Sequence, residues 1–441
     1  MGAAVVPRDD EHPMPADSPA ALGWLWPILV LALCHAQAIA SFQILNILTD
    51  PIKASLAISD TQYSLLQGLA VAVFAAILGI PAARRADVQS RRNIILVGAC
   101  GWSLATLACA FANDFAQIFI ARVFMGVGEV FLFPAALSLI ADLAPRGRWS
   151  SAVAAFGSGG PLGAAAALYG GSWVLPHRSL LVGWIPVLSG LEGWRIAFLL
   201  CGLSGIATAG LLLTVLEPAR HQSLASDRSW KALFHWLVKH WAGYAFVSGG
   251  MLCLALCAFA TAAWVPTVLT RVHHLPLERT GPMTACAALI GGLLLSYPAG
   301  VLVDRLHRRG NSDGVLLVGI ALAVGLISLT TLAATARGLA ITAWVILYAL
   351  LGIPTVLAGT ALPMMTPRPM RAQVMALHLL LMNLLALSLG PFMVAVLTEA
   401  LFGRKTAVGT SLGIVDAGAA GLAAFLFLVG RRSFKASCSA A

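Results

Sequence analysis

Twelve long apolar runs divide the chain and constrain its fold more than any other feature. A helix needs about 20 apolar residues to cross the roughly 30 Å hydrocarbon core of a membrane, and each run is close to that length. Short connections that carry proline, glycine, asparagine or aspartate separate them. The sequence therefore predicts an all-α polytopic membrane protein. We expect its spans at residues 22–45, 61–82, 93–112, 115–140, 150–174, 193–216, 241–268, 280–303, 314–335, 338–364, 373–400 and 407–430.

The composition supports a membrane protein and excludes most soluble classes. Hydrophobic residues make up 59% of the chain and charged residues 10%, against about 25% charged residues in soluble domains. This excludes a cytosolic enzyme, a coiled coil and a disordered chain. The net charge of +10 arises from loops between apolar runs, so we expect no nucleic-acid partner. Seven of the eight cysteines lie inside apolar runs without metal-site spacing, which predicts no metal, cofactor or disulfide.

The positions of lysine and arginine set the orientation. Alternate connections hold nineteen basic residues on one side and seven on the other, and the richer side is expected to be cytoplasmic. Both termini then face the cytoplasm, as tails at 1–21 and 431–441. The first tail is acidic, unlike the start of a signal peptide. The longest interior connection, 217–240, mixes basic and apolar residues at helical spacing and predicts an interfacial amphipathic helix.

An internal repeat divides the chain into two similar parts. The same pattern of proline, small residues, aspartate and paired arginines occurs twice, 217 residues apart, each time after an even-numbered span. We therefore expect two six-helix halves, 22–216 and 241–430, with a substrate site between them at the membrane midplane. The two copies are Pro81-Ala82-Ala83, Asp87, Arg91-Arg92 and Pro298-Ala299-Gly300, Asp304, Arg308-Arg309.

The first copy resembles the loop between spans 2 and 3 of the major facilitator superfamily, reading Gly79 to Asp87 and then Arg91-Arg92. Within that superfamily the chain is similar to the spinster-type group. The resemblance implies the major facilitator fold, with spans 1, 4, 7 and 10 around a central cavity, and adds lysolipids and sphingoid-type lipids as candidate substrates. It rests on Asp50-Pro51-Ile52-Lys53, Ser59-Asp60-Thr61-Gln62, Leu66-Gln67-Gly68, the stretch from Arg122 to Glu129, and Pro134-Ala135-Ala136.

The repeated loops are candidate gating elements. An aspartate at the cytoplasmic end of a helix pair can accept backbone N–H groups from a neighbouring helix N-terminus, and basic side chains nearby could reach Asp142. Such contacts can form in one transporter state and break in another. We expect Asp87, Arg91 and Arg92 to act in this way. In the second half Asp304, Arg308 and Arg309 correspond to them; the alternative is that the arginines only enforce orientation.

Two charges within the run at 115–140 are the leading candidates for the transport site. A charge at the centre of a span costs at least about 2.5–3.5 kcal/mol on insertion scales. Arg122 and Glu129 are seven residues apart, so they share a helix face at a separation of about 10 Å along the axis. We expect Arg122 to hold an anionic substrate group and Glu129 to exchange a proton. The resemblance implies the same, and the alternative is a structural buried pair.

The first span departs from the spinster-type pattern. That group commonly carries an Asp-Arg pair where this chain has Ser41-Phe42. Either Glu129 alone carries the proton, or coupling is altered or lost. His35 and Gln37 on the same span could supply a substitute polar group, or His35 is simply hydrogen-bonded to a neighbouring helix.

Other polar residues inside spans carry weaker signals. Trp264 in the seventh span and Tyr348 in the tenth are expected cavity walls, because the resemblance places these spans around the pore. Asp416 in the last span is expected to have a structural or lipid-edge role. The patch from Gly159 to Gly163 contains a GxxxG step, for which close helix packing is the favoured interpretation.

These features predict a secondary active transporter that is proton-coupled and works by alternating access. Its expected partners are protons, membrane lipids and a small-molecule or lipid substrate, either an amphiphile or an organic anion. An uncoupled uniporter or lipid facilitator is the alternative, given Ser41. No connection is long enough for a catalytic domain, so we do not expect an enzyme. The chain is expected to be a monomer in a bacterial inner membrane.

Overall fold

The structure is a computed structural model that describes residues 23–72, 90–145, 147–218, 230–336 and 338–441. Every regular element in these ranges is a helix. The helices are α1 (Leu25–Ile47), α2 (Thr49–Leu56), α3 (Asp60–Gln67), α5 (Arg91–Ala110), α6 (Phe115–Leu143), α7 (Trp149–Val174), α8 (Arg178–Trp184), α9 (Gly193–Leu211), α10 (Trp230–Lys239), α11 (Trp241–Arg271), α12 (Leu277–Leu289), α13 (Ser296–Arg308), α14 (Gly314–Thr335), α15 (Ala340–Ala349), α16 (Ile353–Met364), α17 (Arg371–Leu381), α18 (Ser388–Val396) and α19 (Val408–Ala440).

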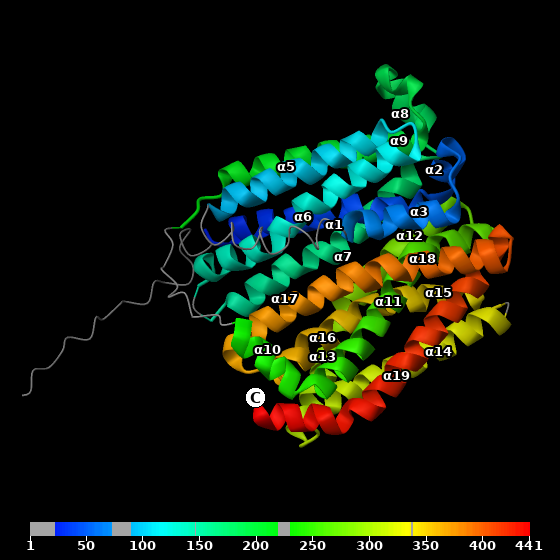
Figure 1. Ribbon diagram of the computed structural model, residues 1–441. Helices are drawn as coiled ribbons and strands as arrows, with labels where there is room; N and C mark the ends of the chain where they lie inside the picture. The colour runs from blue at the N-terminus through cyan, green and yellow to red at the C-terminus, as the bar shows by residue number, and fades with distance from the viewer. Residues whose placement is uncertain (1–22, 73–89, 146, 219–229, 337) are drawn as a thin grey trace, which may run out of the picture.

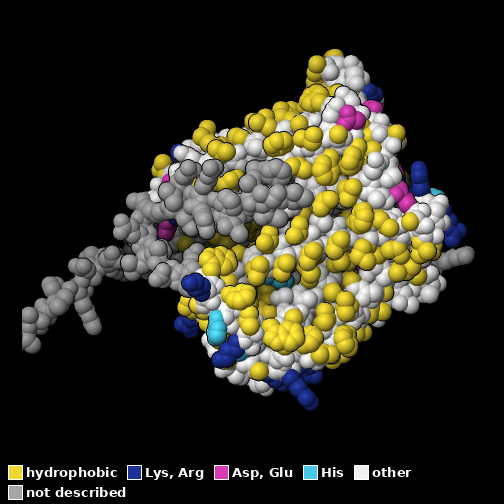
Figure 2. Space-filling view, viewed as in Figure 1, with side chains coloured by type: hydrophobic (Ala, Val, Ile, Leu, Met, Phe, Trp, Pro, Cys, Tyr) yellow, Lys and Arg dark blue, Asp and Glu magenta, His cyan; other side chains and the backbone are white. Residues whose placement is uncertain are grey.

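Eleven helical stretches of the described residues are long and apolar enough to cross a membrane. The remaining expected span, 61–82, starts within α3, and its residues from 73 onward lie outside the described residues. The prediction of an all-α membrane fold is thus confirmed. In Figure 2 hydrophobic side chains cover the broad side wall, while lysines and arginines gather mainly toward the two ends.

The helices form two bundles that lie side by side (Figure 1). In the N-terminal half, residues 23–218, α1 packs on α7, and α5 packs on α6 and α9. In the C-terminal half, residues 230–441, α19 packs on α11 and α14. The halves meet where α3 contacts α18 and α7 contacts α12. We call the end that carries α2 and α8 the outer end, following the count of basic residues.

The glycine patch of the fifth span brings two helices into close contact. A Cβ added at Gly159 would collide with the carbonyl oxygen of Ala32, and one at Gly163 with that of Ala36. Both carbonyls belong to α1. Two turns further along α7, a Cβ added at Gly170 would meet no described atom within 4 Å. Packing is therefore confirmed as the role of the GxxxG step.

Several spans of the C-terminal half are interrupted near their middle. A π-helical turn at Ile290–Leu295 separates α12 from α13, and another at Met382–Leu387 separates α17 from α18. Such turns often occur at functional sites because they re-aim side chains within a helix. The turn at Met382–Leu387 directly borders the cavity described below.

The inner end of the C-terminal half is fixed by charges. The expected tail at 431–441 is helical, because α19 continues without a break to Ala440. Arg431 Nε lies 2.6 Å from Asp313 Oδ2, and Lys435 Nζ lies 3.1 Å from Oδ1. Burial alone would raise the pKa of the Asp313 carboxyl, but its bonds to these two cations hold it below its usual value. The expected linker helix is present as α10.

Candidate functional site

A cavity of about 180 Å³ lies between the two halves. Its walls come from α1, α3, α11, α16 and the stretch from Met382 to α18. The lining is mostly alanine, leucine, proline and phenylalanine, and none of the described residues in it carries a charge. The described residues that line it are Phe42, Gln43, Asn46, Gln67, Ala255, Ala258, Phe259, Ala262, Ala263, Leu351, Pro354, Thr355, Met382, Leu387 and Pro391.

Three amide side chains form a connected group on one wall of this cavity. Gln67 Nε2 donates to Asn46 Oδ1 at 3.2 Å and to the backbone oxygen of Ala263 at 3.3 Å. Asn46 Nδ2 in turn donates to Gln43 Oε1 at 2.5 Å. The bond to Ala263 crosses from the N-terminal to the C-terminal half. No role was expected for these amides, although Gln67 lies within a motif that carries the resemblance.

Arg122 is fully buried and joins three helices. Its Nε donates to the Leu66 backbone oxygen at 3.1 Å, and its Nη1 donates to the Ser41 backbone oxygen at 3.3 Å. The guanidinium also lies 5.4 Å from the centre of the Phe42 ring, and Phe42 lines the cavity. Arg122 itself is not among the lining residues. In this state it therefore fastens α6 to α1 and α3 from behind the cavity wall.

Glu129 belongs to α6, but its side chain lies outside the described part of the structure. Its proposed proton exchange stays a prediction. The polar residues of the first span that could replace the missing acidic residue form their hydrogen bonds within the N-terminal half. His35 Nδ1 is 3.0 Å from the Phe156 backbone oxygen, as in the neighbour-bonded alternative. Gln37 Nε2 donates to the backbone oxygen of Cys201 at 2.6 Å. Ser41 Oγ lies 3.7 Å from the sulfur of the same cysteine.

The expected cavity walls of the seventh and tenth spans are set back from the cavity. Trp264 is fully buried and donates its Nε1 hydrogen to the Pro391 backbone oxygen at 2.9 Å. Tyr348 is 2% exposed, and neither ring lines the cavity. The two residues before Trp264, Ala262 and Ala263, occupy the wall instead, because they lie on the face of α11 toward α1 and α3.

Asp416 is not at a lipid edge, so that part of the expectation is wrong. It is 1% exposed, because α19 turns this face onto α11. Its Oδ2 accepts a hydrogen bond from Thr261 Oγ1 at 2.8 Å, and its backbone oxygen accepts from the Cys257 thiol at 3.4 Å. The structural role expected for Asp416 fits this position.

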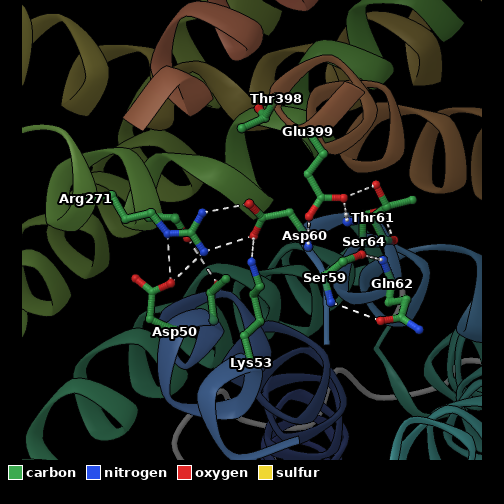
Figure 3. A network of polar contacts seen from close by, with 12 residues as sticks. Asp50, Lys53, Ser59, Asp60, Thr61, Gln62, Ser64, Arg271, Thr398 and Glu399 are labelled. Atoms are coloured by element: carbon green, nitrogen blue, oxygen red, sulfur yellow. Dashed lines mark hydrogen bonds and ion pairs between the residues drawn. The ribbon is translucent and has the colours of Figure 1, made fainter. Parts of the chain in front are cut away.

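An ion network, buried except at Asp50, joins the halves at the outer end (Figure 3). Arg271, the last residue of α11, directs Nη1 and Nη2 at the Asp60 carboxylate, each at 3.0 Å. It also pairs with Asp50 at 2.6 Å, while Lys53 pairs with Asp60. Asp60 is 1% exposed and Lys53 8%. Because the network links α2 and α3 to α11, it can persist only while the outer ends of the halves stay together.

The start of α3 depends on both halves. Ser59 and Gln62 form a capping box, in which each side chain bonds the backbone N–H of the other at 3.0 Å. The two N–H groups between them, at Asp60 and Thr61, donate to the Glu399 carboxylate at 2.5 and 3.0 Å. Glu399 comes from the outer end of the C-terminal half. A carboxylate at a helix N-terminus is favoured by the helix dipole.

At the inner end, Arg91 confirms one expected contact. It forms an ion pair with Asp142, and its Nε lies 3.2 Å from Glu217 Oε1. Glu217 also accepts hydrogen bonds from the Ser90 side chain and from the Arg91 backbone N–H at 2.8 Å. Burial alone would raise the pKa of the Glu217 carboxyl, but these bonds hold it below its usual value. All of these residues lie in the N-terminal half, and Glu217 was not anticipated.

The other described gating candidates form fewer polar contacts than Arg91 does. Asp87 lies outside the described residues. Arg92 Nη1 donates to the Val215 backbone oxygen at 3.2 Å. In the second copy, Asp304, Arg308 and Arg309 are exposed and form no ion pair with any residue in the described ranges. Their latch role stays a prediction.

Comparison with known families matches residues 31–391 to the family model described as Major Facilitator Superfamily. The chain is 26% identical over 267 residues to an MFS-type efflux pump of Mycolicibacterium smegmatis, covering 60% of this chain and 58% of the pump. It is 26% identical over 283 residues to a gallate transporter of Pseudomonas putida, covering 59% and 60%. The alignments thus span about three fifths of these two relatives. Protein spinster homolog 1 of Xenopus tropicalis is 26% identical over 388 residues, covering 81% and 69%.

Solved structures share the fold over nearly the whole chain. A bacterial homologue of the human lysosomal transporter spinster, in an inward-facing and unoccupied conformation, superposes with a TM-score of 0.78 at 22% identity. The match covers 94% of this chain and 98% of that one. A D-xylose–proton symporter superposes with a TM-score of 0.67 at 16% identity, covering 91% and 97%. At these identities the likeness establishes a common architecture of two helical bundles.

Proposed function

The chain belongs to the major facilitator superfamily, and from this premise we propose that it is a secondary active transporter that moves an amphiphilic organic substrate by alternating access. The site lies in the cavity between the halves. Movement of the two bundles against each other would expose it to either side of the membrane in turn, as in other transporters built from repeated halves.

The distribution of contacts between the halves carries this proposal. Every side-chain hydrogen bond between described residues of opposite halves lies from the cavity outward. These bonds start at Gln67, pass through Thr267 and Thr49 at 3.1 Å, and end at Arg271 and Glu399. A barrier at one end of a central cavity is what one state of an alternating-access cycle requires.

Proton coupling is the second part of the proposal. Glu129 lies two turns from Arg122 on α6, and an ionisable residue within a membrane-spanning helix is by default a candidate for proton transfer. We assign Glu129 as the group that takes up and releases the proton. In the state described, Arg122 organises the junction of α1, α3 and α6. We assign the inner loops with Asp87 and Asp304 to the closing of the inner side.

The test uses purified protein in proteoliposomes with a fluorescently labelled lysolipid and a labelled monoacylglycerol. Uptake driven by an inward proton gradient is expected in the wild type and lost in Glu129→Gln. Asp416→Asn is the matched control, because Asp416 is a buried carboxyl of the same fold that does not line the cavity. Gradient-driven uptake that persists in Glu129→Gln would refute the coupling assignment.

An uncoupled facilitator is the second candidate, and Ser41 favours it. At this position the backbone oxygen accepts a hydrogen bond from Arg122, so the arginine has a partner on α1 without the acidic residue of the spinster-type pattern. Saturable transport of either labelled lipid that is insensitive to the proton gradient would support this alternative.

A further inference from the structure

The amide group on the cavity wall leaves one acceptor without a partner among the described residues. Gln67 is 2% exposed, and its buried Oε1 makes no hydrogen bond with any of them. Gln67 lines the cavity. A buried polar atom of this kind is a site where a ligand gains affinity, because a donor supplied by the ligand replaces a missing bond.

The orientation of the Gln67 amide is set by its neighbours. Nε2 lies 3.3 Å from the backbone oxygen of Ala263, and a backbone carbonyl can only accept. The nitrogen must therefore face Ala263, and the oxygen is the atom left unpaired. The second Nε2 hydrogen is used by Asn46 Oδ1 at 3.2 Å. Gln67 thus has an unpaired acceptor beside the cavity and no further donor.

Gln43 supplies the complementary group. Its Oε1 accepts from Asn46 Nδ2 at 2.5 Å, which leaves its own amide hydrogens as donors. Its Nε2 forms no hydrogen bond with a residue in the described ranges, and the half-buried side chain lines the same cavity. One wall therefore presents an acceptor and a donor, linked through Asn46 and surrounded by alanine, leucine and phenylalanine.

We propose that the cavity binds an uncharged amphiphile whose head group carries hydroxyls, one donating to Gln67 Oε1 and another accepting from Gln43 Nε2. The apolar part of the ligand lies against the aliphatic walls around Phe259 and Met382. This inference rests on the proposed transport function and names its substrate class. It replaces the organic anion expected from the sequence.

The lining disfavours a charged head group. No residue that lines the cavity in the described structure has a charged side chain. Arg122, which was expected to hold an anion, donates to two backbone oxygens behind Phe42. Moving an ion from water into such surroundings is unfavourable without an opposite charge or a full set of hydrogen bonds.

The experiment compares ligands that share one acyl chain. Binding of monooctanoyl glycerol, methyl octanoate and octanoate to the purified full-length chain in nanodiscs is measured by ligand-induced thermal stabilisation and by titration. We expect monooctanoyl glycerol to bind at least about threefold more tightly than methyl octanoate, which lacks donors, and more tightly than octanoate. Equal or tighter binding of octanoate by the wild type overturns the proposal without any mutant.

Variants locate the binding to the amides. Gln67→Leu and Gln43→Leu should each weaken binding of monooctanoyl glycerol by about three- to tenfold and leave methyl octanoate unchanged. Gln373→Leu is the matched control. Gln373 is a buried glutamine outside the cavity lining, and its Nε2 has no hydrogen-bond partner among the described residues. Gln43→Leu keeps the hydrogen bond between Gln67 and Ala263 that links the halves. Its effect on binding therefore tests the proposal even if Gln67→Leu does not fold.

The outcomes separate this inference from the transport assignment. Binding that depends on Gln67 and Gln43, without movement of a labelled monoacylglycerol across proteoliposomes, would support the ligand class and refute transport of it. Gradient-driven uptake of a labelled anionic lipid, unaffected by either variant, would preserve the proposed function and overturn the uncharged, hydroxyl-bearing substrate.

Discussion

Arg271 and Asp60 face each other across the boundary between the halves, with both terminal guanidinium nitrogens 3.0 Å from the carboxylate oxygens. Both side chains are buried, at 8% and 1% exposure. Such a pair is sensitive to the loss of one partner, because the other charge then stays buried without compensation. The outer barrier of this state therefore depends strongly on Arg271.

Arg271→Gln should open the outer side. Breaking a buried ion pair costs roughly 3–5 kcal/mol, so states in which Asp60 is hydrated gain population. The measurement is labelling of Thr267→Cys by a membrane-impermeant maleimide added outside intact cells, corrected for the native cysteines. We expect the cysteine to be labelled about tenfold faster, or more, in the Thr267→Cys/Arg271→Gln double variant than in Thr267→Cys alone. Arg279→Gln, an exposed arginine of α12, is the control. Unchanged labelling would show that Arg271 does not hold the barrier.

Gly163→Ala should destabilise the N-terminal half, whereas Gly170→Ala on the same helix should not. The added methyl at Gly163 meets the carbonyl oxygen of Ala36, and overpacking of this kind costs about 1–3 kcal/mol. A methyl added at Gly170 has no described atom within 4 Å, and alanine favours the helix over glycine by up to about 1 kcal/mol. Thermal unfolding in detergent checks both. Similar melting temperatures for the two variants would contradict the close approach of α7 and α1.

Thr261→Val should reduce stability more than Asp416→Asn does. Valine removes the hydroxyl donor to Asp416 Oδ2 and leaves a buried carboxyl group unpaired, at a cost of about 1–3 kcal/mol. Asparagine keeps an acceptor oxygen at the same place and carries no charge, so a change within about 1 kcal/mol is expected. Apparent melting temperatures of the two variants provide the comparison. A larger loss in Asp416→Asn would indicate that the carboxyl group itself is needed.

Lowering the pH should weaken the inner end of the N-terminal half through Glu217. Its folded-state pKa lies below the ordinary value of 4.5, so its contribution to stability is present above that pH and is lost as the pH falls through the folded value. Melting temperatures measured from about pH 6 to about pH 3 should fall less steeply in Glu217→Gln than in the wild type. Glu278→Gln, at an exposed carboxyl of α12, should behave as the wild type. Parallel curves for all three would exclude Glu217 as a source of the acid sensitivity.

The architecture was predictable because span length and charge placement are local properties of a sequence. Eleven of the twelve apolar runs correspond to the spans found among the described residues, and Arg91 meets Asp142 as expected, because neighbouring spans bring their inner ends together. The GxxxG step also met a helix as its small residues indicated. These features need little knowledge of how distant helices are arranged.

The site itself was less predictable, because it depends on the meeting of distant segments. Arg271 and Asp60 are 211 residues apart, and Glu399 and Thr61 are 338 apart. No local sequence pattern predicts pairs that lie so far apart in the chain. The partners of Arg122 include backbone oxygens, which every residue possesses, so its position behind the cavity wall had no signature in side-chain types. The motif that contains Asp60 and Gln67 indicated kinship rather than these roles.

The cap on α3 has an evolutionary consequence. Asp60 and Thr61 contribute main-chain amides to Glu399, and those amides survive any replacement of the two side chains except by proline. Substitutions at these two positions would therefore remove the ion pairs of Asp60 but keep the hydrogen bonds of the cap. Glu399, in contrast, contributes its side-chain carboxylate. A single substitution of Glu399 would therefore remove the bonds that hold the start of α3 to the C-terminal half.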